Sequence, residues 1–236
     1  MNLLQIPTTA YDTLREMSQQ VTTTMETPET AISTFDLAIK GGWLMIVLFV
    51  LLLLSIYVLI ERILVIRNAG KEDDSFMNRI KDYIHEGKIE SALALCRKTD
   101  TPAARMVEKG ISRLGRPMSD ITEAIENVGN IEIAKLEKGL PILATTAAGA
   151  PMIGFLGTVT GMVKAFMSMA SAGVNVNVNI LSTGIYEALI TTVGGLIVGI
   201  IALFAYNYLT TQIKGIVNRM EMRIMEFMDI LNEPAN

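Results

Sequence analysis

The stretch GIYEALITTVGGLIVGIIALFAYN (184–207) is apolar enough to cross a membrane, yet it carries one carboxylate and two adjacent hydroxyls. A hydrocarbon core about 30 Å thick takes roughly 20 apolar residues of helix. The carboxylate is that of Glu187, and the adjacent hydroxyls are those of Thr191 and Thr192. A charged side chain costs roughly 2.5–3.5 kcal/mol or more at the bilayer centre, so such residues usually have a functional role or a partner. These three residues are therefore candidates for a functional site.

The composition also indicates a membrane protein. Half of the 236 residues are hydrophobic and only 19% are charged, whereas a soluble domain averages about 25% charged residues. The net charge is −4 and no basic tract is present, which gives no support for nucleic-acid binding. One cysteine and one histidine, Cys96 and His85, exclude a disulfide framework and an ordinary Cys/His metal site. We therefore expect no enzyme, no metal and no cofactor.

Three windows are long enough to span a membrane as helices: 42–60, 140–164 and 185–208. The first holds no charge, the second is uncharged up to Lys164, and the third holds Glu187 alone. We expect Lys164 to anchor its helix at the membrane surface. The first window is not predicted to be a cleavable signal, because 41 mostly polar residues precede it. The sequence predicts an all-α membrane protein with three transmembrane helices and long helical extensions.

The distribution of lysine and arginine predicts the orientation of these spans. Residues 1–41 contain two such cations, residues 62–139 contain fourteen, residues 170–184 contain none, and the tail contains Lys214, Arg219 and Arg223. Cytoplasmic segments carry the excess of positive charge. We therefore place the N-terminal segment 1–41 outside, the loop 61–139 inside, the connection 165–184 outside and the tail 209–236 inside.

The inside loop has the pattern of a small helical domain. Apolar residues at helical spacing predict one helix from Phe76 to Ile84 and a second that begins at Ile89. Thr101 and Pro102 suit the N-cap and first position of a third helix reaching residue 114. We expect Ser119 to cap a fourth helix. That helix should continue into the second span without a break, with kinks at prolines 141 and 151.

The tail carries a heptad pattern over almost three repeats. Its apolar positions alternate steps of four and three, at Ile213, Val217, Met220, Ile224, Phe227 and Leu231. This pattern predicts that the third span continues inward as an amphipathic helix. The apolar seam could pack on the core of its own domain or lie at an interface between subunits, and the sequence alone leaves both interpretations open.

The second and third spans carry stripes of small residues. Small residues allow membrane helices to approach closely, and this is how such helices associate in lipid. We expect helix packing at Gly154, Gly157 and Gly161 of the second span and at Gly194 and Gly195 of the third. For most of these glycines packing is the whole role.

The threonines of these spans lie at matching depths. Thr158 and Thr192 are each roughly 10 Å from the outer end of their span, so antiparallel neighbours would bring the two hydroxyls to one level. A membrane threonine often bonds only to a carbonyl of its own helix. On an ideal helix Glu187 and Thr191 share a face, whereas Thr192 points elsewhere. None of the spans has an acid or histidine at its midplane, where proton relays normally have one, so a protonatable acid should come from a partner chain.

Two motifs carry a resemblance to a known family. The second span contains APMIGFLGTVTGMVKAF (150–166), which fits AP-x-x-G-x-x-GTV-x-G, and the third contains EAL-x-x-T and a closing YN within 184–207. From about residue 40 onward the chain resembles the MotA/TolQ/ExbB proton-channel family, most of all its ExbB and TolQ branch. Phe155 replaces the more usual Leu, and Ile200–Ala202 lacks the family's proline, which bears on local helix geometry. Residues 1–40 match nothing in the family.

The resemblance implies a function and a set of partners. Such proteins form a homo-pentamer in the bacterial inner membrane, with the N-terminus periplasmic and the C-terminus cytoplasmic. They enclose an ExbD- or TolR-like single-span dimer whose aspartate takes up the proton. Proton flow drives TonB for outer-membrane transport, or TolA for envelope maintenance. On this resemblance the proton path would include Thr158, Thr192 and Glu187, the last near the outer mouth, and Thr191 is a further lining candidate.

Several other functions compete with an ExbB-like channel. A MotA-like stator subunit fits less well because such chains have four spans. A TolQ-like or gliding-type motor subunit would use the same mechanism. From another class, the chain could be a membrane scaffold that transports nothing. A self-contained solute channel is disfavoured because the spans have no charged ring at mid-depth. Scaffold and channel differ in that only the channel needs the hydroxyls of Thr158 and Thr192.

Overall fold

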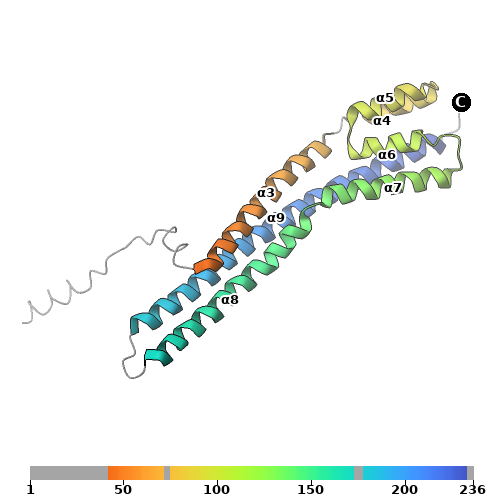
Figure 1. Cartoon of the computed structure of the whole chain (residues 1–236). Helices are drawn as coiled ribbons and strands as arrows, with labels where there is room; N and C mark the ends of the chain where they lie inside the picture. Colours follow the sequence, from red (N-terminus) through yellow and green to blue (C-terminus); the bar gives the residue numbers. More distant parts are fainter. Residues whose placement is uncertain (1–41, 72–74, 173–177, 233–236) are drawn as a thin grey trace, which may run out of the picture. The chain divides into compact units, whose positions relative to one another are not determined.

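The computed structural model describes residues 42–71, 75–172 and 178–232, so the predictions for residues 1–41 lie outside the described residues. These described residues form helices and no strand. The helices, labelled in Figure 1, are α3 (Gly42–Ala69), α4 (Phe76–His85), α5 (Ile89–Thr99), α6 (Pro102–Ile111), α7 (Met118–Glu137), α8 (Leu140–Ala172) and α9 (Val178–Asn232).

Three helical stretches are long and apolar enough to cross a membrane: Gly42–Ala69, Met118–Ser171 and Leu181–Asn232. This confirms the predicted class of an all-α protein with three such helices. We call α3, α8 and residues 178–208 of α9 the spanning bundle. In it α8 lies along α9, and α3 packs against both. The bundle has a small buried core, formed by Leu48, Ala150 and Val198, and most other large apolar side chains of α3 face outward.

A second group of packed helices consists of α4–α7 and residues 209–232 of α9. We call this whole group the head domain. Its core includes Phe76, Ile80, Val107, Ile125 and Phe227, all fully buried. The heptad positions of α9 pack on this core: Ile213, Met220 and Phe227 are buried, and Val217, Ile224 and Leu231 lie partly buried against them. Within this chain, the seam thus serves its own domain, and α9 runs unbroken from the spanning bundle into the head domain.

The head-domain helices begin and end close to the positions expected from the sequence. Thr101 caps α6, because its side-chain oxygen accepts a hydrogen bond from the Ala104 amide at 3.3 Å and Pro102 occupies the first helical position. Gly87, with φ +70°, follows α4. The expectation for Ser119 is wrong, since α7 begins at Met118 after Pro117 and Ser119 lies inside the first turn.

The predicted continuous helix from the head domain into the second span is also wrong. Helix α7 ends at Glu137 and α8 begins at Leu140, with Gly139 between them at φ +90°, a conformation that favours glycine. Pro141 explains the break. In an unbroken helix its ring would clash with the carbonyl of Glu137, whereas in the first turn of α8 its missing N–H costs nothing. Pro151, by contrast, lies inside α8.

Candidate functional site

Glycines allow the backbones of α8 and α9 to come into direct contact. A Cβ atom at Gly195 would lie 2.5 Å from the Ala150 carbonyl oxygen and 2.9 Å from the Cα of Gly154. A Cβ at Gly154 would lie 2.8 Å from the Thr191 carbonyl oxygen, and one at Gly161 would lie 2.9 Å from the Cβ of Ala188. We call this contact the glycine seam. Side chains larger than hydrogen at these positions would push the two backbones apart.

Thr191 lies in the glycine seam. Its side chain is 2% exposed, and a Cβ atom at Gly157 would overlap its hydroxyl. The Thr191 hydroxyl donates a hydrogen bond at 2.7 Å to the Ala188 carbonyl of its own helix. This bond satisfies the donor locally, which is the common arrangement for threonine in membrane helices.

Thr192 of α9 forms a side-chain hydrogen bond to α8. Its hydroxyl donates to the Gly154 carbonyl at 3.0 Å. Because Gly154 has no side chain, the carbonyl is accessible from the neighbouring helix. The side chain of Thr192 is half-buried. A hydroxyl that donates one hydrogen bond still has lone pairs with which it accepts others, so the Thr192 oxygen can accept a further hydrogen bond.

Thr158 lies on α8 next to Gly157, at the level where that glycine meets Thr191. Its hydroxyl donates to the Phe155 carbonyl at 2.6 Å, within its own helix. The residue is half-buried, while Phe155 and Val159 beside it are exposed. The structure therefore brings Thr191 and Thr192 into the α8–α9 contact and places Thr158 at the same level, without a direct bond between Thr158 and either of them.

Glu187 and Gly194 face α3 instead. A Cβ atom at Gly42, the first residue of α3, would lie 2.5 Å from Oε1 of Glu187. A Cβ at Gly194 would lie 3.1 Å from the sulfur of Met45. Gly42 has φ +69°, a backbone conformation that favours glycine. Glu187 is thus set apart from the hydroxyls and lies at the start of the first span.

Sequence reasoning did not single out the ends of the glycine seam as site residues. A Cβ at Gly184 would lie 2.8 Å from the Cβ of Ala165, and one at Gly199 would lie 2.7 Å from Cγ of Pro151. The signal for the first pair is present in the sequence, because Gly157, Gly161 and Ala165 follow each other at steps of four. The close approach of Gly199 to a proline ring depends on the register between the helices, which the sequence pattern does not contain.

The described residues show no arrangement typical of catalysis by a metal or a thiolate. No group of three or more His, Cys, Asp or Glu side chains in the described part of the chain could hold a metal ion. Burial, followed by the negative charge of Glu108, raises the pKa of the Cys96 thiol to about 12. Because the thiolate is the nucleophilic form, this cysteine is inert at neutral pH.

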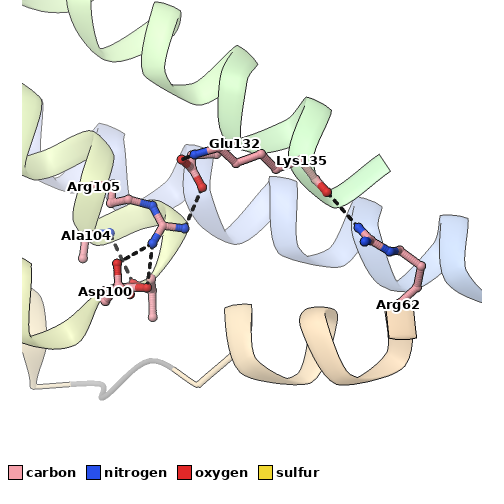
Figure 2. Close-up of polar contacts among 7 residues, drawn as sticks. Arg62, Asp100, Ala104, Arg105, Glu132 and Lys135 are labelled. Atoms are coloured by element: carbon pink, nitrogen blue, oxygen red, sulfur yellow. Dashed lines mark hydrogen bonds and ion pairs between the residues drawn. The ribbon is translucent and has the colours of Figure 1, made fainter. Parts of the chain in front are cut away.

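A second polar cluster lies in the head domain, around the buried carboxylate of Glu132. Arg105 Nη2 and Lys135 Nζ donate to its two oxygens at 2.6 and 2.7 Å, and Arg105 also binds Asp100 (Figure 2). Burial by itself would raise the pKa of Glu132, but the hydrogen bonds from Arg105 and Lys135 outweigh it, so the pKa of Glu132 lies below its ordinary value. The carboxylate is therefore charged and holds α6 against α7.

We predict that Glu132→Gln destabilises the head domain and makes its stability depend less on pH in the acidic range. Losing two charge-assisted hydrogen bonds should cost about 1.5–3 kcal/mol at pH 7, or roughly 3–12 °C in melting temperature. Because the folded pKa is lowered, the stabilisation is complete above the unfolded pKa of about 4.3 and is lost as pH falls through the folded pKa. The melting temperatures of variant and wild type should therefore differ at pH 7 and approach each other as the pH is lowered to 3. Glu137→Gln, exposed on the same helix, is the control; an equal effect there would contradict the prediction.

Comparison with known proteins places this arrangement in a family. Residues 98–222, more than half of the chain, match the model of the MotA/TolQ/ExbB proton channel family. The chain is 32% identical over 219 residues to the Tol-Pal system protein TolQ of Haemophilus influenzae, which covers 86% of this chain and 96% of that protein. It is 32% identical over 101 residues to the biopolymer transport protein ExbB of Xanthomonas campestris pv. campestris, which covers 43% of this chain and 40% of that protein.

A third relative is an ExbB homologue from Methanothermobacter thermautotrophicus. The two are 29% identical over 164 residues, which is 69% of this chain, and the match spans 58% of the length of that protein. The family match includes the whole glycine seam with Thr158, Thr191 and Thr192. The matched region, the three apolar helices and the likeness to proteins named ExbB and TolQ lead to one conclusion: this chain is a member of the MotA/TolQ/ExbB proton channel family.

Proposed function

We propose that this chain is the ExbB-like proton-channel subunit of a bacterial inner-membrane motor. With an ExbD-like partner it converts proton motive force into mechanical work for TonB-dependent outer-membrane transport. The observation that carries the proposal is the pair of hydroxyls, Thr191 and Thr192, at a glycine seam inside the family-matched segment. These polar groups lie in a mainly apolar bundle, whose three spans contain Glu187 as their single acid.

In the proposed assembly five copies of the chain surround the single-span helices of an ExbD-like dimer. The N-terminus is periplasmic and the C-terminus is cytoplasmic, as the distribution of positive charge favours. The partner's acid takes up the proton, because the spans of this chain offer none at mid-depth. Thr158 and Thr192 line the path with hydroxyls, which both donate and accept hydrogen bonds, and Glu187 lies at its outer end with Thr191 as a further lining residue.

A TolQ-like role is the second candidate, favoured by a specific observation. The match to the Haemophilus influenzae protein covers nearly the full length of both chains, whereas the match to the Xanthomonas campestris ExbB covers less than half of each. A TolQ-like subunit would use the same seam and hydroxyls but would pair with a TolR-like partner and drive a TolA-like protein. Co-purification from cells that express both kinds of partner separates the two roles.

The test is proton flux into liposomes that contain the full chain with and without an ExbD- or TolR-like partner. We expect flux under an imposed potential only with the partner, and only while the partner's membrane aspartate is intact. Thr192→Val should lower this flux about a hundredfold, as loss of a proton-transfer group does, while Thr192→Ser should retain most of it.

Thr211→Val is the matched control. Thr211 lies on the same helix beyond the third span, is exposed, and donates its hydroxyl to the Asn207 carbonyl of its own helix. Its flux should equal that of wild type. The valine at position 192 forfeits one interhelical hydrogen bond, worth about 0.6–2 kcal/mol, so the oligomer should still form. Full flux from a Thr158→Val, Thr192→Val double variant would refute the proposal and favour a scaffold.

A further inference from the structure

Arg62 of α3 is buried at a position where the sequence suggests a surface cation. It lies two residues after the uncharged window 42–60, and an arginine there commonly extends its head to the membrane surface. In the structure Arg62 is only 4% exposed. A buried guanidinium needs partners within the protein, because desolvating a charge is costly.

The guanidinium of Arg62 is bound to the C-terminal end of α7. Its Nη1 donates to the Lys135 carbonyl at 3.0 Å (Figure 2), and its Nη2 to the Glu61 carboxylate at 2.5 Å. Helix α7 ends at Glu137, so the Lys135 carbonyl is among the last four, which lack a partner inside their own helix. A cation at this end of a helix is also favoured by the helix dipole. Arg62 therefore caps α7 from a different helix.

The same arginine borders the break between α7 and α8. A Cβ atom at Gly139 would lie 3.1 Å from Cγ1 of Val58 and 3.8 Å from Nε of Arg62. Val58 and Arg62 are one turn apart on α3, so one face of that helix covers the break. Glycine allows many backbone conformations, and the direction in which α8 leaves α7 must consequently be set by contacts around Gly139.

On its other side the last part of α7 is bonded to α6 of the head domain. Lys135, whose carbonyl accepts from Arg62, uses its amine to bind Glu132, and Glu132 binds Arg105 of α6. Arg105 in turn binds the side chain and the carbonyl of Asp100. Figure 2 shows these contacts as one series that runs from α3 across α7 to α6. The end of α7 is thus bonded to α3 of the spanning bundle on one side and to α6 of the head domain on the other.

We propose that Arg62 is a positioning residue: it fixes the angle at the α7–α8 break and thereby couples the head domain to the second span. The α8 helix carries Thr158 and the Gly154 carbonyl that Thr192 binds. A change in the angle at Gly139 tilts α8 and alters the register of these groups. The transport part of this inference rests on the proposed function; the structural part does not.

The test compares Arg62→Met with Arg67→Met in the full chain, purified in lipid nanodiscs. Arg67 is exposed on the same helix, which makes it the matched control. Hydrogen exchange is followed by mass spectrometry over residues 132–145. Loss of a charged hydrogen-bond donor should speed exchange there by about tenfold or more in Arg62→Met, with α4 and α5 unchanged and with no change anywhere in Arg67→Met. Proton flux with the partner should fall by about tenfold, within the range of typical coupling effects.

Unchanged exchange over residues 132–145 in Arg62→Met would overturn the proposal, and so would an equal rise in α4 and α5, which indicates general destabilisation. If Arg62→Met does not form a stable oligomer, Arg62→Lys decides instead. The lysine keeps the charge but loses the forked guanidinium, so a smaller rise confined to residues 132–145 is expected, and its absence overturns the proposal. A wild-type chain without flux would refute the proposed function, and the exchange data would still decide the role of Arg62.

Discussion

Gly195→Ala should unfold the spanning bundle at a much lower temperature than wild type. The three atoms nearest to the added methyl group would be backbone atoms of α8, at 2.5–3.1 Å: the Ala150 carbonyl oxygen and the Cα and amide nitrogen of Gly154. Backbone cannot rotate away as a side chain can, so the two helices must separate. We expect a cost of about 3 kcal/mol and a melting temperature lower by about 6–12 °C, measured by circular dichroism in detergent.

Gly215→Ala is the matched control for this prediction. Gly215 lies on the same helix, and a Cβ atom there would have no other atom within 4 Å. Replacing glycine by alanine in an open helical position should stabilise the protein by about 0.5–1 kcal/mol. The same substitution is thus expected to lower stability at position 195 and to raise it at position 215, 20 residues further along α9. Equal effects at both positions would mean that the glycine seam is not the tight contact described here.

Phe227→Ala should be the most destabilising substitution in the head domain. Phe227 is fully buried and is among the largest side chains of the core, and truncating a buried phenylalanine costs about 3–5 kcal/mol. The melting temperature should fall by about 6–20 °C. Phe227 comes from α9, so this loss should also detach the end of that helix from α4–α7, which faster hydrogen exchange over residues 220–232 would report.

A second substitution provides a sharper version of this test. A Cβ atom at Gly110 of α6 would overlap the Phe227 ring and lie 2.9 Å from Cδ1 of Ile125. Gly110→Ala should therefore destabilise the wild-type protein. In the Phe227→Ala background the new methyl group enters the vacated space, so the same change should stabilise. Additive melting temperatures in the double variant would contradict the packing of Phe227 on Gly110.

The helices and spans could be predicted from local sequence patterns, because helix caps and apolar windows depend on residues that are close together in the chain. Long uncharged windows predicted the three apolar helices, and Thr101 with Pro102 predicted the start of α6. The prediction of an unbroken helix across Gly139 was wrong, although the sequence contains both Gly139 and Pro141. Gly139 adopts φ +90° at the break, Pro141 fits the first turn of the new helix, and Leu140 and Leu143 are buried in the core cluster that includes the head domain.

The candidate site was predictable in its residue types and less so in its contacts. Small residues at steps of three and four predict that helices approach closely, but they do not determine the register between them. The bond from Thr192 to the Gly154 carbonyl depends on that register. The burial of Arg62 was equally beyond reach, since a cation after a span usually lies at the surface and its actual partner is a carbonyl 73 positions away in the chain.

Two of the connections between the spanning bundle and the head domain, α9 and the α7–α8 break, differ in stiffness. Helix α9 is a single element of 55 residues, about 80 Å long at 1.5 Å per residue, whereas the path through α8 and α7 is interrupted at Gly139. An unbroken helix carries torque along its axis, and a jointed one bends. A rotation imposed on the spanning bundle would therefore be transmitted to the head domain along α9. The break at Gly139 would allow α8 to change its tilt relative to α7 at the same time.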